Sequence, residues 1–185
     1  MRAAMIVPGI GLVVLAVFVG AGFLTSNPVQ QTNHSTRAFT VPGTSLRAEP
    51  AAHVLEVIAV AGQPPSNVIN SVSIPEGATR TAFMNKTASV GSYDAQITLT
   101  ANLSQGAVET FYRKALKTQG WQIISNGPAD HLAGGLEVLA KKAGSDGFYW
   151  DIAAVVSPTS FGPGAPAAGD TRFTLELYQE SDPGT

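Results

Sequence analysis

The sequence predicts the α+β class, with one helix packed on a four- to six-stranded antiparallel sheet. Three observations support this prediction. One stretch beyond the N-terminal segment, residues 104–120, has the local marks of an amphipathic helix. Strand-like runs precede and follow it and are separated by turns rich in glycine and proline. The order of strand, helix and strand meander does not alternate as in βαβ proteins, which indicates an antiparallel sheet with the helix on one face.

The helix is predicted to begin after Ser104 and to end before Gly120. The Ser104 hydroxyl can accept a backbone amide of the first turn, and glycine suits the left-handed residue that follows a helix. Apolar residues recur between these ends at spacings of three and four, which predicts one buried stripe. The stripe consists of Val108, Phe111, Tyr112, Ala115 and Leu116.

Strands are predicted on both sides of the helix. Residues 93–101 alternate between apolar and polar side chains, the period of a half-buried strand. Residues 80–88 precede them closely enough to form a hairpin. Later strands are expected at residues 121–125, 136–142, 148–156 and 171–179. The predicted core comprises Ile97, Leu99, Val108, Phe111, Leu116, Trp121, Ile123, Val138, Ile152, Val155, Phe173, Leu175 and Leu177.

An apolar segment without charges occupies residues 3–24. As a helix it would be about 33 Å long, which is enough to cross a hydrocarbon core of about 30 Å. A transmembrane anchor or uncleaved signal is therefore predicted at residues 1–24. Arg2 precedes the segment and the next basic residue is Arg37, so the positive-inside rule places the N-terminus in the cytoplasm and the rest outside. The alternative is secretion after signal cleavage behind Ala21.

Residues 25–52 are polar and contain several prolines, so a flexible linker is expected there. A single extracytoplasmic domain is predicted at residues 53–182. Its first part is left open: residues 53–62 suit a strand or a short helix. Residues 63–78 contain three prolines and are expected to run irregularly over the surface.

The composition excludes several kinds of site. The 185 residues include no cysteine, so disulfides, thiol nucleophiles and cysteine metal sites are excluded. A net charge of -2 provides no basic surface for a nucleic-acid backbone, and no nucleic-acid partner is expected. The three histidines are scattered and show no metal-ligand spacing. We expect no catalytic, cofactor or metal site.

Three aspartates are candidates for a catalytic group, Asp130, Asp146 and Asp151. Asp130 is followed by His131, but neighbours in sequence rarely face each other, and a surface turn accounts for both. Asp146 and Asp151 flank the segment GFYW, and turn and strand-edge positions account for them. A hydrolase that uses Asp130, His131 or another loop acid is the least favoured of three functions.

Aromatic residues supply the candidate interaction surface. Phe148 and Trp150 share one face of a predicted strand, while Tyr149 lies on the other. Tyr178 and Phe161, the latter in a proline- and glycine-rich loop, complete the set. An aromatic residue on a solvated sheet face can bind a peptide, a sugar or a lipid. The alternative is that these rings are covered by the linker or by the proline-rich loop.

The segment YDAQITLTANLSQGAVETFYRKALKTQGW, residues 93–121, resembles an element of uncharacterised bacterial envelope proteins. In these proteins, many of them actinobacterial lipoproteins or single-span proteins, a strand is followed by a helix with the pattern FYxxxLxxxGW and by further strands. The resemblance implies a membrane-anchored envelope protein without an established catalytic site. The acceptor cysteine of the lipoproteins is absent from this sequence.

Together these features lead us to expect a non-catalytic, membrane-tethered domain that binds a protein of the bacterial cell envelope. The alternative is a domain that holds a small ligand or a lipid between helix and sheet.

Overall fold

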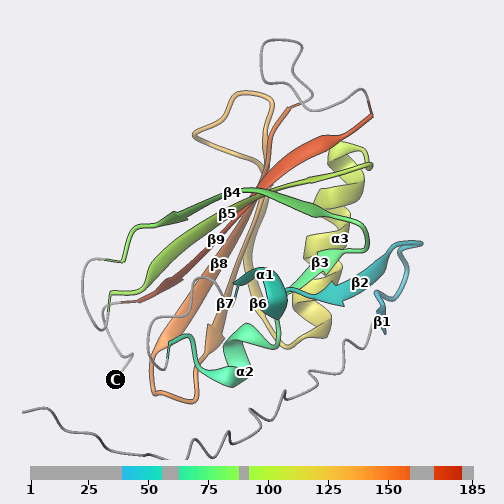
Figure 1. Ribbon diagram of the computed structural model, residues 1–185. Coiled ribbons are helices and arrows are strands. Elements are labelled where there is room, and N and C mark those ends of the chain that lie inside the picture. Colours follow the sequence, from blue (N-terminus) through green and yellow to red (C-terminus); the bar gives the residue numbers. More distant parts are fainter. Residues whose placement is uncertain (1–38, 56–62, 88–91, 159–168, 181–185) are drawn as a thin grey trace, which may run out of the picture. The chain divides into compact units, whose positions relative to one another are not determined.

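A six-stranded antiparallel sheet forms the centre of the computed structural model, which describes residues 39–55, 63–87, 92–158 and 169–180 (Figure 1). All of these residues belong to one compact unit of the chain, Ser35–Thr185. The strand order is β4-β5-β9-β8-β7-β6, so the last strand lies in the middle. The strands are β4 (Thr79–Asn85), β5 (Asp94–Ala101), β6 (Gln122–Pro128), β7 (Leu136–Ala143), β8 (Tyr149–Val156) and β9 (Thr171–Gln179).

The α+β prediction is confirmed. β4 and β5 form the predicted hairpin, and β6 to β9 form the predicted meander, whose last strand pairs with β5 in register from Asp94 opposite Tyr178 to Ala101 opposite Thr171. The helix α3 (Gln105–Thr118) connects the two parts, because it joins β5 near one edge of the sheet to β6 at the other edge.

Both ends of α3 follow from local chemistry. The Ser104 hydroxyl accepts a hydrogen bond from the Ala107 amide at 3.3 Å, as expected for an N-cap. Gly120 follows the helix with a φ of +81°, which glycine adopts without strain. The backbone can therefore turn at once into β6. The apolar stripe predicted for α3 forms the buried face of this helix.

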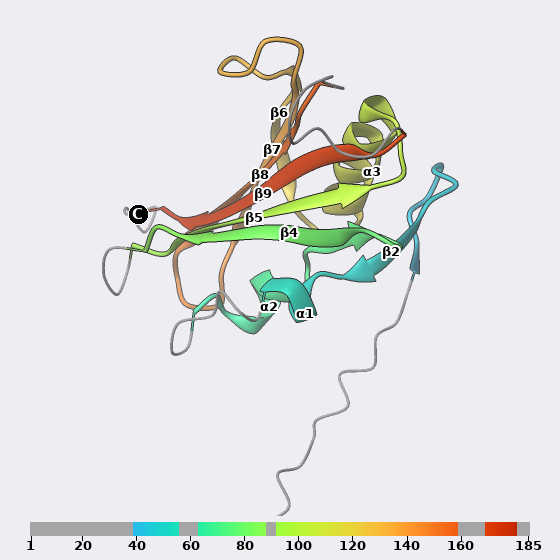
Figure 2. The same ribbon diagram turned by 45° about the horizontal axis from the view of Figure 1, so that its top comes forward.

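α3 covers one face of the sheet (Figures 1 and 2). Tyr112 packs against Phe173 of β9 with ring centroids 5.6 Å apart, and against Phe111 at 5.2 Å. All three rings are fully buried. Two predicted core positions differ. Ile123 is only partly buried, and Val155 lies on the opposite face, because side chains alternate along β8 and Val156 takes the core position.

The predicted linker, residues 25–52, is wrong from Phe39 onward. A three-stranded antiparallel sheet has the order β1-β2-β3, with β1 (Phe39–Thr40), β2 (Arg47–Pro50) and β3 (Ser73–Pro75). Pro42 and Gly43 make the turn between β1 and β2: the Thr44 amide donates to the Val41 carbonyl at 3.1 Å, and Gly43 has a φ of +72°. One of the prolines that suggested a linker therefore lies in the turn of a hairpin.

Residues 63–78 were also predicted wrongly, as an irregular surface segment. They contain the short helix α2 (Ser66–Ile69) and strand β3. Val68, Val72 and Ile74 are buried in the core. Pro64 and Pro65 precede α2, and Pro75 is the last residue of β3, so none of the three lies inside an element. Of residues 53–62, left open above, residues 53–55 belong to a short helix, α1 (Ala52–Leu55), and residues 56–62 lie outside the described part.

A buried tryptophan connects the segment before β3 of the three-stranded sheet to the start of β6 in the six-stranded sheet. Trp121, the last residue of the FYxxxLxxxGW pattern, donates its indole N–H to the carbonyl and to the hydroxyl of Ser71, each at 3.0 Å.

No helix among the described residues is long and apolar enough to cross a membrane. The predicted anchor, residues 1–24, lies outside the described part.

Candidate functional site: the open face of the sheet

The face of the six-stranded sheet opposite α3 carries polar side chains, and we call it the open face. The described helices and the three-stranded sheet lie on the other side (Figure 2). Burial alternates along β5 and β9, where every second residue is only half-buried. The half-buried positions of the open face include Asp94, Gln96 and Thr98 on β5, Thr174, Glu176 and Tyr178 on β9, and Glu137, Leu139 and Lys141 on β7.

A row of four residues crosses four strands of this face, near the start of β5 and the end of β9. Asp94 on β5 lies opposite Tyr178 on β9, which lies opposite Asp151 on β8, which in turn lies opposite Lys141 on β7. β8 and β9 are the two central strands of the sheet. Two acidic residues therefore flank one tyrosine that lies on a central strand of the open face.

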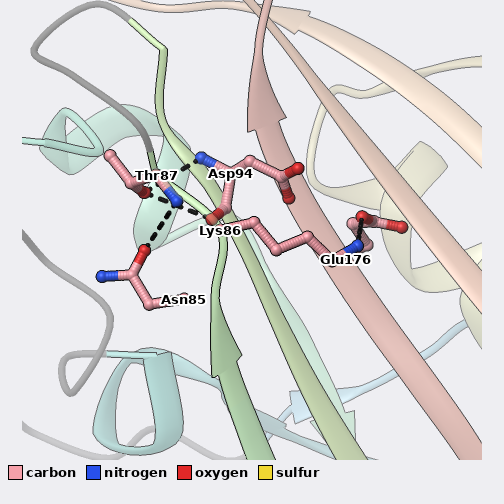
Figure 3. Close-up of polar contacts among 5 residues, drawn as sticks. All are labelled: Asn85, Lys86, Thr87, Asp94 and Glu176. Atoms are coloured by element: carbon pink, nitrogen blue, oxygen red, sulfur yellow. Dashed lines mark hydrogen bonds and ion pairs between the residues drawn. The ribbon is translucent and has the colours of Figure 1, made fainter.

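Each aspartate has a glutamate and a lysine beside it. On one side, the ammonium group of Lys86 lies 2.5 Å from a carboxylate oxygen of Glu176, and the pair passes across β5 near Asp94 (Figure 3). The main chain at Asp94 is also fixed there, since its carbonyl accepts from the Lys86 amide at 2.8 Å. On the other side, Lys141 and Glu180 form a second ion pair close to Asp151. The same three residue types thus occur twice.

The lysines neutralise the glutamates and leave the aspartates in excess. A hydrogen bond with Lys141 is the main reason that the pKa of Glu180 is lowered. A hydrogen bond with Glu176 likewise raises the pKa of Lys86. Four carboxyl groups share two ammonium groups on this part of the face, so the ionised set has a net charge of -2.

Asp151 is the most confined of these groups. Only 5% of the residue is exposed, and its Oδ1 atom has no hydrogen-bond partner within the described part of the chain. Burial raises the pKa of Asp151 to about 6, and the nearby Glu180 carboxylate adds to the shift. A buried carboxylate without a full set of partners is costly, so a strand residue of this kind needs an explanation.

Burial also raises the pKa values of Asp94 and Tyr178, which share the row with Asp151. Burial raises the pKa of Asp94, with Glu176 contributing, and a buried Oδ1 atom of Asp94 again lacks a partner among the described residues. Burial raises the pKa of Tyr178 to about 12, and the Asp151 carboxylate adds to that shift by its charge and by a hydrogen bond. The hydroxyl of Tyr178 therefore remains protonated as a donor toward Asp151.

Tyr149 and Lys141 form the rim of the site. Tyr149 is 38% exposed, and the ammonium group of Lys141 lies 5.2 Å from the centroid of its ring. A cation over an aromatic ring is attracted by the electrons of its face. The rim thus combines an accessible aromatic surface with a cation that already contacts it.

The predicted interaction residues are separated by the fold. Trp150 is not exposed: it is fully buried on the helix side, 5.3 Å from the ring of Tyr93, and its indole N–H donates to Asp146. Phe148, next to the turn, is half-buried. Tyr178 lies on the open face, and Phe161 lies outside the described residues. Trp150 takes the core because it shares the face of Ile152, and Tyr149 is left outside.

Asp130 and His131 lie in an exposed turn before β7. The nearest acidic group to His131 is Glu137, with 3.8 Å between Nδ1 and a carboxylate oxygen. Asp146 lies in a turn as predicted, but Asp151 is inside a central strand and not at its edge. Among the described residues, no three His, Cys, Asp or Glu side chains are grouped so as to hold a metal ion.

The sequence did not predict the row of Asp94, Tyr178 and Asp151. One signal was available: aspartate is disfavoured inside strands, and Asp151 interrupts an otherwise apolar strand. Which residues would lie opposite it depended on the pairing of β8 with β9 across a long loop.

Comparisons of the chain with protein-family models, with curated proteins and with solved structures give no significant match.

Proposed function

We propose that this protein is a non-catalytic, membrane-tethered domain of the bacterial cell envelope, and that it binds a partner protein through the open face of its sheet. The observation that carries the proposal is Asp151, a buried residue of a central strand on that face whose Oδ1 atom has no hydrogen-bond partner among the described residues. Sequence and fold agree at most positions of a natural protein, and departures concentrate at functional sites. A buried acidic group in a central strand is such a departure.

The face of the sheet under α3 is filled by apolar side chains, whereas the open face carries polar ones, and a binding surface for a partner fits the open face. On the helix side, large apolar side chains fill the contact between α3 and the strands, as the rings of Phe111, Tyr112 and Phe173 illustrate. This packing favours the open face over the helix–sheet contact as the place where a partner binds, and it weighs against a ligand held beneath α3. The open face offers an accessible tyrosine beside charged and hydroxyl groups, and tyrosine is enriched at protein interfaces.

A non-catalytic role is supported by the placement of the acidic groups. The exposed turn of Asp130 and His131 provides no buried setting that would tune a catalytic pair. The carboxyl groups of Asp94, Glu176, Asp151 and Glu180 are arranged as two sets, each with an ion-paired lysine. Attachment to the membrane is supported by the uncharged segment at residues 3–24. N-terminal sequencing of the mature protein tests this point, since a start at residue 22 would remove the anchor.

Site-specific photo-crosslinking in intact cells tests the proposal. A photoreactive phenylalanine replaces Tyr149 on the open face in one strain, and Lys117 on the exposed side of α3 in the control strain. We expect a discrete adduct from position 149 that is absent from position 117. Adducts of equal yield and size from both positions, or none from position 149 and from a second open-face position such as Thr98, would contradict it.

A further inference from the structure

We propose that the Asp94–Tyr178–Asp151 row is a recognition site for a cationic side chain, arginine or lysine, of the partner protein. This inference rests on the proposed function for the source of the cation. It adds the chemistry of recognition, which concerns three named residues on neighbouring strands of the open face.

The first argument is charge. Lys86 is ion-paired with Glu176 and Lys141 with Glu180, so each aspartate shares its nearest ammonium group with a glutamate. One further positive charge would lie beside two carboxylates that now compete for too few cations. Hydrogen bonds to a charged group are stronger than those between neutral groups.

The second argument is the unsatisfied acceptors. The Oδ1 atoms of Asp94 and Asp151 are both buried and have no partner in the described part of the chain. Asp151 is itself more than nine-tenths buried, so water cannot freely replace the missing donor. Arginine has five N–H donors and lysine has three, and neither accepts a hydrogen bond. A cationic side chain therefore supplies what these atoms lack.

The third argument is geometry. Neighbouring strands lie about 4.8 Å apart, so the main chains of Asp94 and Asp151, with one strand between them, are separated by about 10 Å. A cation that docks over Tyr178 is adjacent to both. Tyr149 and Lys141 lie at the edge of the site, and both side chains are partly exposed. Displacement of the Lys141 side chain from the Tyr149 ring would give access to Asp151 and free the ring for the incoming cation.

The site is expected to respond to pH because protons compete with the cation. The charged and titratable groups that face Asp151 are Tyr178, Glu180, Lys141 and Tyr149, with Asp94, Glu176 and Lys86 on the far side of Tyr178. Burial raises the pKa of Asp151 to about 6, so above that pH the carboxylate is available and below it the proton occupies it. Affinity for a cation should fall as the pH is lowered through 6.

The binding test uses the full chain in neutral detergent and two small probes. N-acetylarginine amide carries the guanidinium group, and N-acetylcitrulline amide has nearly the same shape without the charge. Binding is followed by NMR of the carboxyl carbons of the aspartates. We expect the arginine probe to shift Asp94 and Asp151 and to lower the pKa of Asp151, and the citrulline probe to have no such effect. Asp151→Asn should weaken arginine binding about tenfold or more, the equivalent of one lost charged hydrogen bond.

A matched control removes an acidic group elsewhere. Glu109 on α3 pairs with Arg113 and lies on the other side of the sheet, so Glu109→Gln should leave arginine binding unchanged. Circular dichroism shows that each variant is folded before it is compared. Equal binding of the arginine and citrulline probes, or unchanged arginine binding in Asp151→Asn, would overturn the proposed recognition site.

The crosslink at position 149 separates this inference from the proposed function. An adduct that is lost in the Asp94→Asn, Asp151→Asn double variant supports both. If the adduct persists in that variant, the partner binds the open face without this site and the inference fails alone. If the arginine probe binds but no adduct forms, the site serves a small cation, and both the assignment to a partner side chain and the proposed function are rejected.

Discussion

The ammonium group of Lys86 lies 2.5 Å from the carboxylate of Glu176, two strands away across β5 (Figure 3). Lys86 follows the last residue of β4, and Glu176 is on β9. The ion pair therefore ties the edge hairpin to the centre of the sheet. Burial is the main cause of the raised pKa of Asp94; the Glu176 carboxylate adds to the shift, and the Lys86 ammonium group opposes it.

The coupling between Lys86 and Glu176 is expected to be small. Both side chains are partly exposed, at 37% and 29%, and exposed ion pairs typically contribute about 0.2 to 1 kcal/mol. A double-mutant cycle with Lys86→Met and Glu176→Gln, measured by urea unfolding, should give a coupling energy in that range. In about 1 M salt the coupling should shrink, because exposed charges are screened. A coupling above about 3 kcal/mol would show that the pair is not the surface interaction described here.

Asp151 should make the protein less stable as the pH rises from about 4 to 6. Its pKa is raised from 3.8 to about 6 in the folded state, so in this range the folded protein holds a proton that the unfolded chain has released. One pKa unit corresponds to about 1.4 kcal/mol, which bounds the loss at about 3 kcal/mol.

Asp151→Asn isolates that contribution. The amide keeps the shape of the side chain without its charge, so the variant should be more stable than the natural protein at pH 7.5 and nearly equal to it at pH 4. Urea unfolding at both pH values measures the difference, and Asp130→Asn in the exposed turn is the control. A variant that is destabilised to the same extent at both pH values would show that Asp151 is fully partnered in the folded protein.

Tyr112→Phe is expected to leave the free energy of unfolding unchanged or to raise it. The Tyr112 ring is fully buried under α3, but its hydroxyl has no hydrogen-bond partner within the described residues. Loss of an unsatisfied buried hydroxyl removes a desolvation cost, whereas Tyr112→Ala should lose about 3 to 5 kcal/mol by leaving a cavity. Thermal unfolding compares the two variants. A loss above about 1 kcal/mol in Tyr112→Phe would indicate a bound water or ligand beneath the helix.

Two glycines at opposite ends of α3 should respond oppositely to alanine. Gly106 lies in the first turn, and an added Cβ would meet no atom within 4 Å, so Gly106→Ala should gain about 0.5 to 1 kcal/mol. Gly120 has a φ of +81°, where a Cβ is strained, so Gly120→Ala should lose about 1 to 2 kcal/mol. Urea unfolding of both variants measures the difference. Equal effects at the two positions would contradict the described end of the helix.

Periodicity and capping made α3 and the strands after it predictable. Ser104, the apolar stripe and Gly120 each act within a few residues, and residues 93–101 alternate along a single strand. Elements held by contacts distant in sequence were not predictable in the same way. The hairpin of β1 and β2 is short and apolar at few positions, and β3, which completes its sheet, is more than twenty residues away. Pro42 and Gly43 suit a turn as well as a linker, and only the pairing of β1 with β2 distinguishes the two.

The candidate site was less predictable than the fold for the same reason. The alternation of β8 correctly separates Tyr149 from Trp150, but it does not say which side faces the helix. Trp150 was therefore placed in the surface set when it belongs to the core. The row of Asp94, Tyr178 and Asp151 comes from three strands, and its formation depends on the register of two strand pairs.

The absence of cysteine permits a direct test of the open face as the binding surface. Single cysteines replace Tyr149 on the open face and Lys117 on α3, and a membrane-impermeant maleimide is applied to intact cells and to the purified full chain. We predict that Cys at position 117 reacts at the same rate in both, whereas Cys at position 149 reacts much more slowly in cells, because the partner covers it. Equal rates for position 149 in cells and in the purified protein would contradict the account.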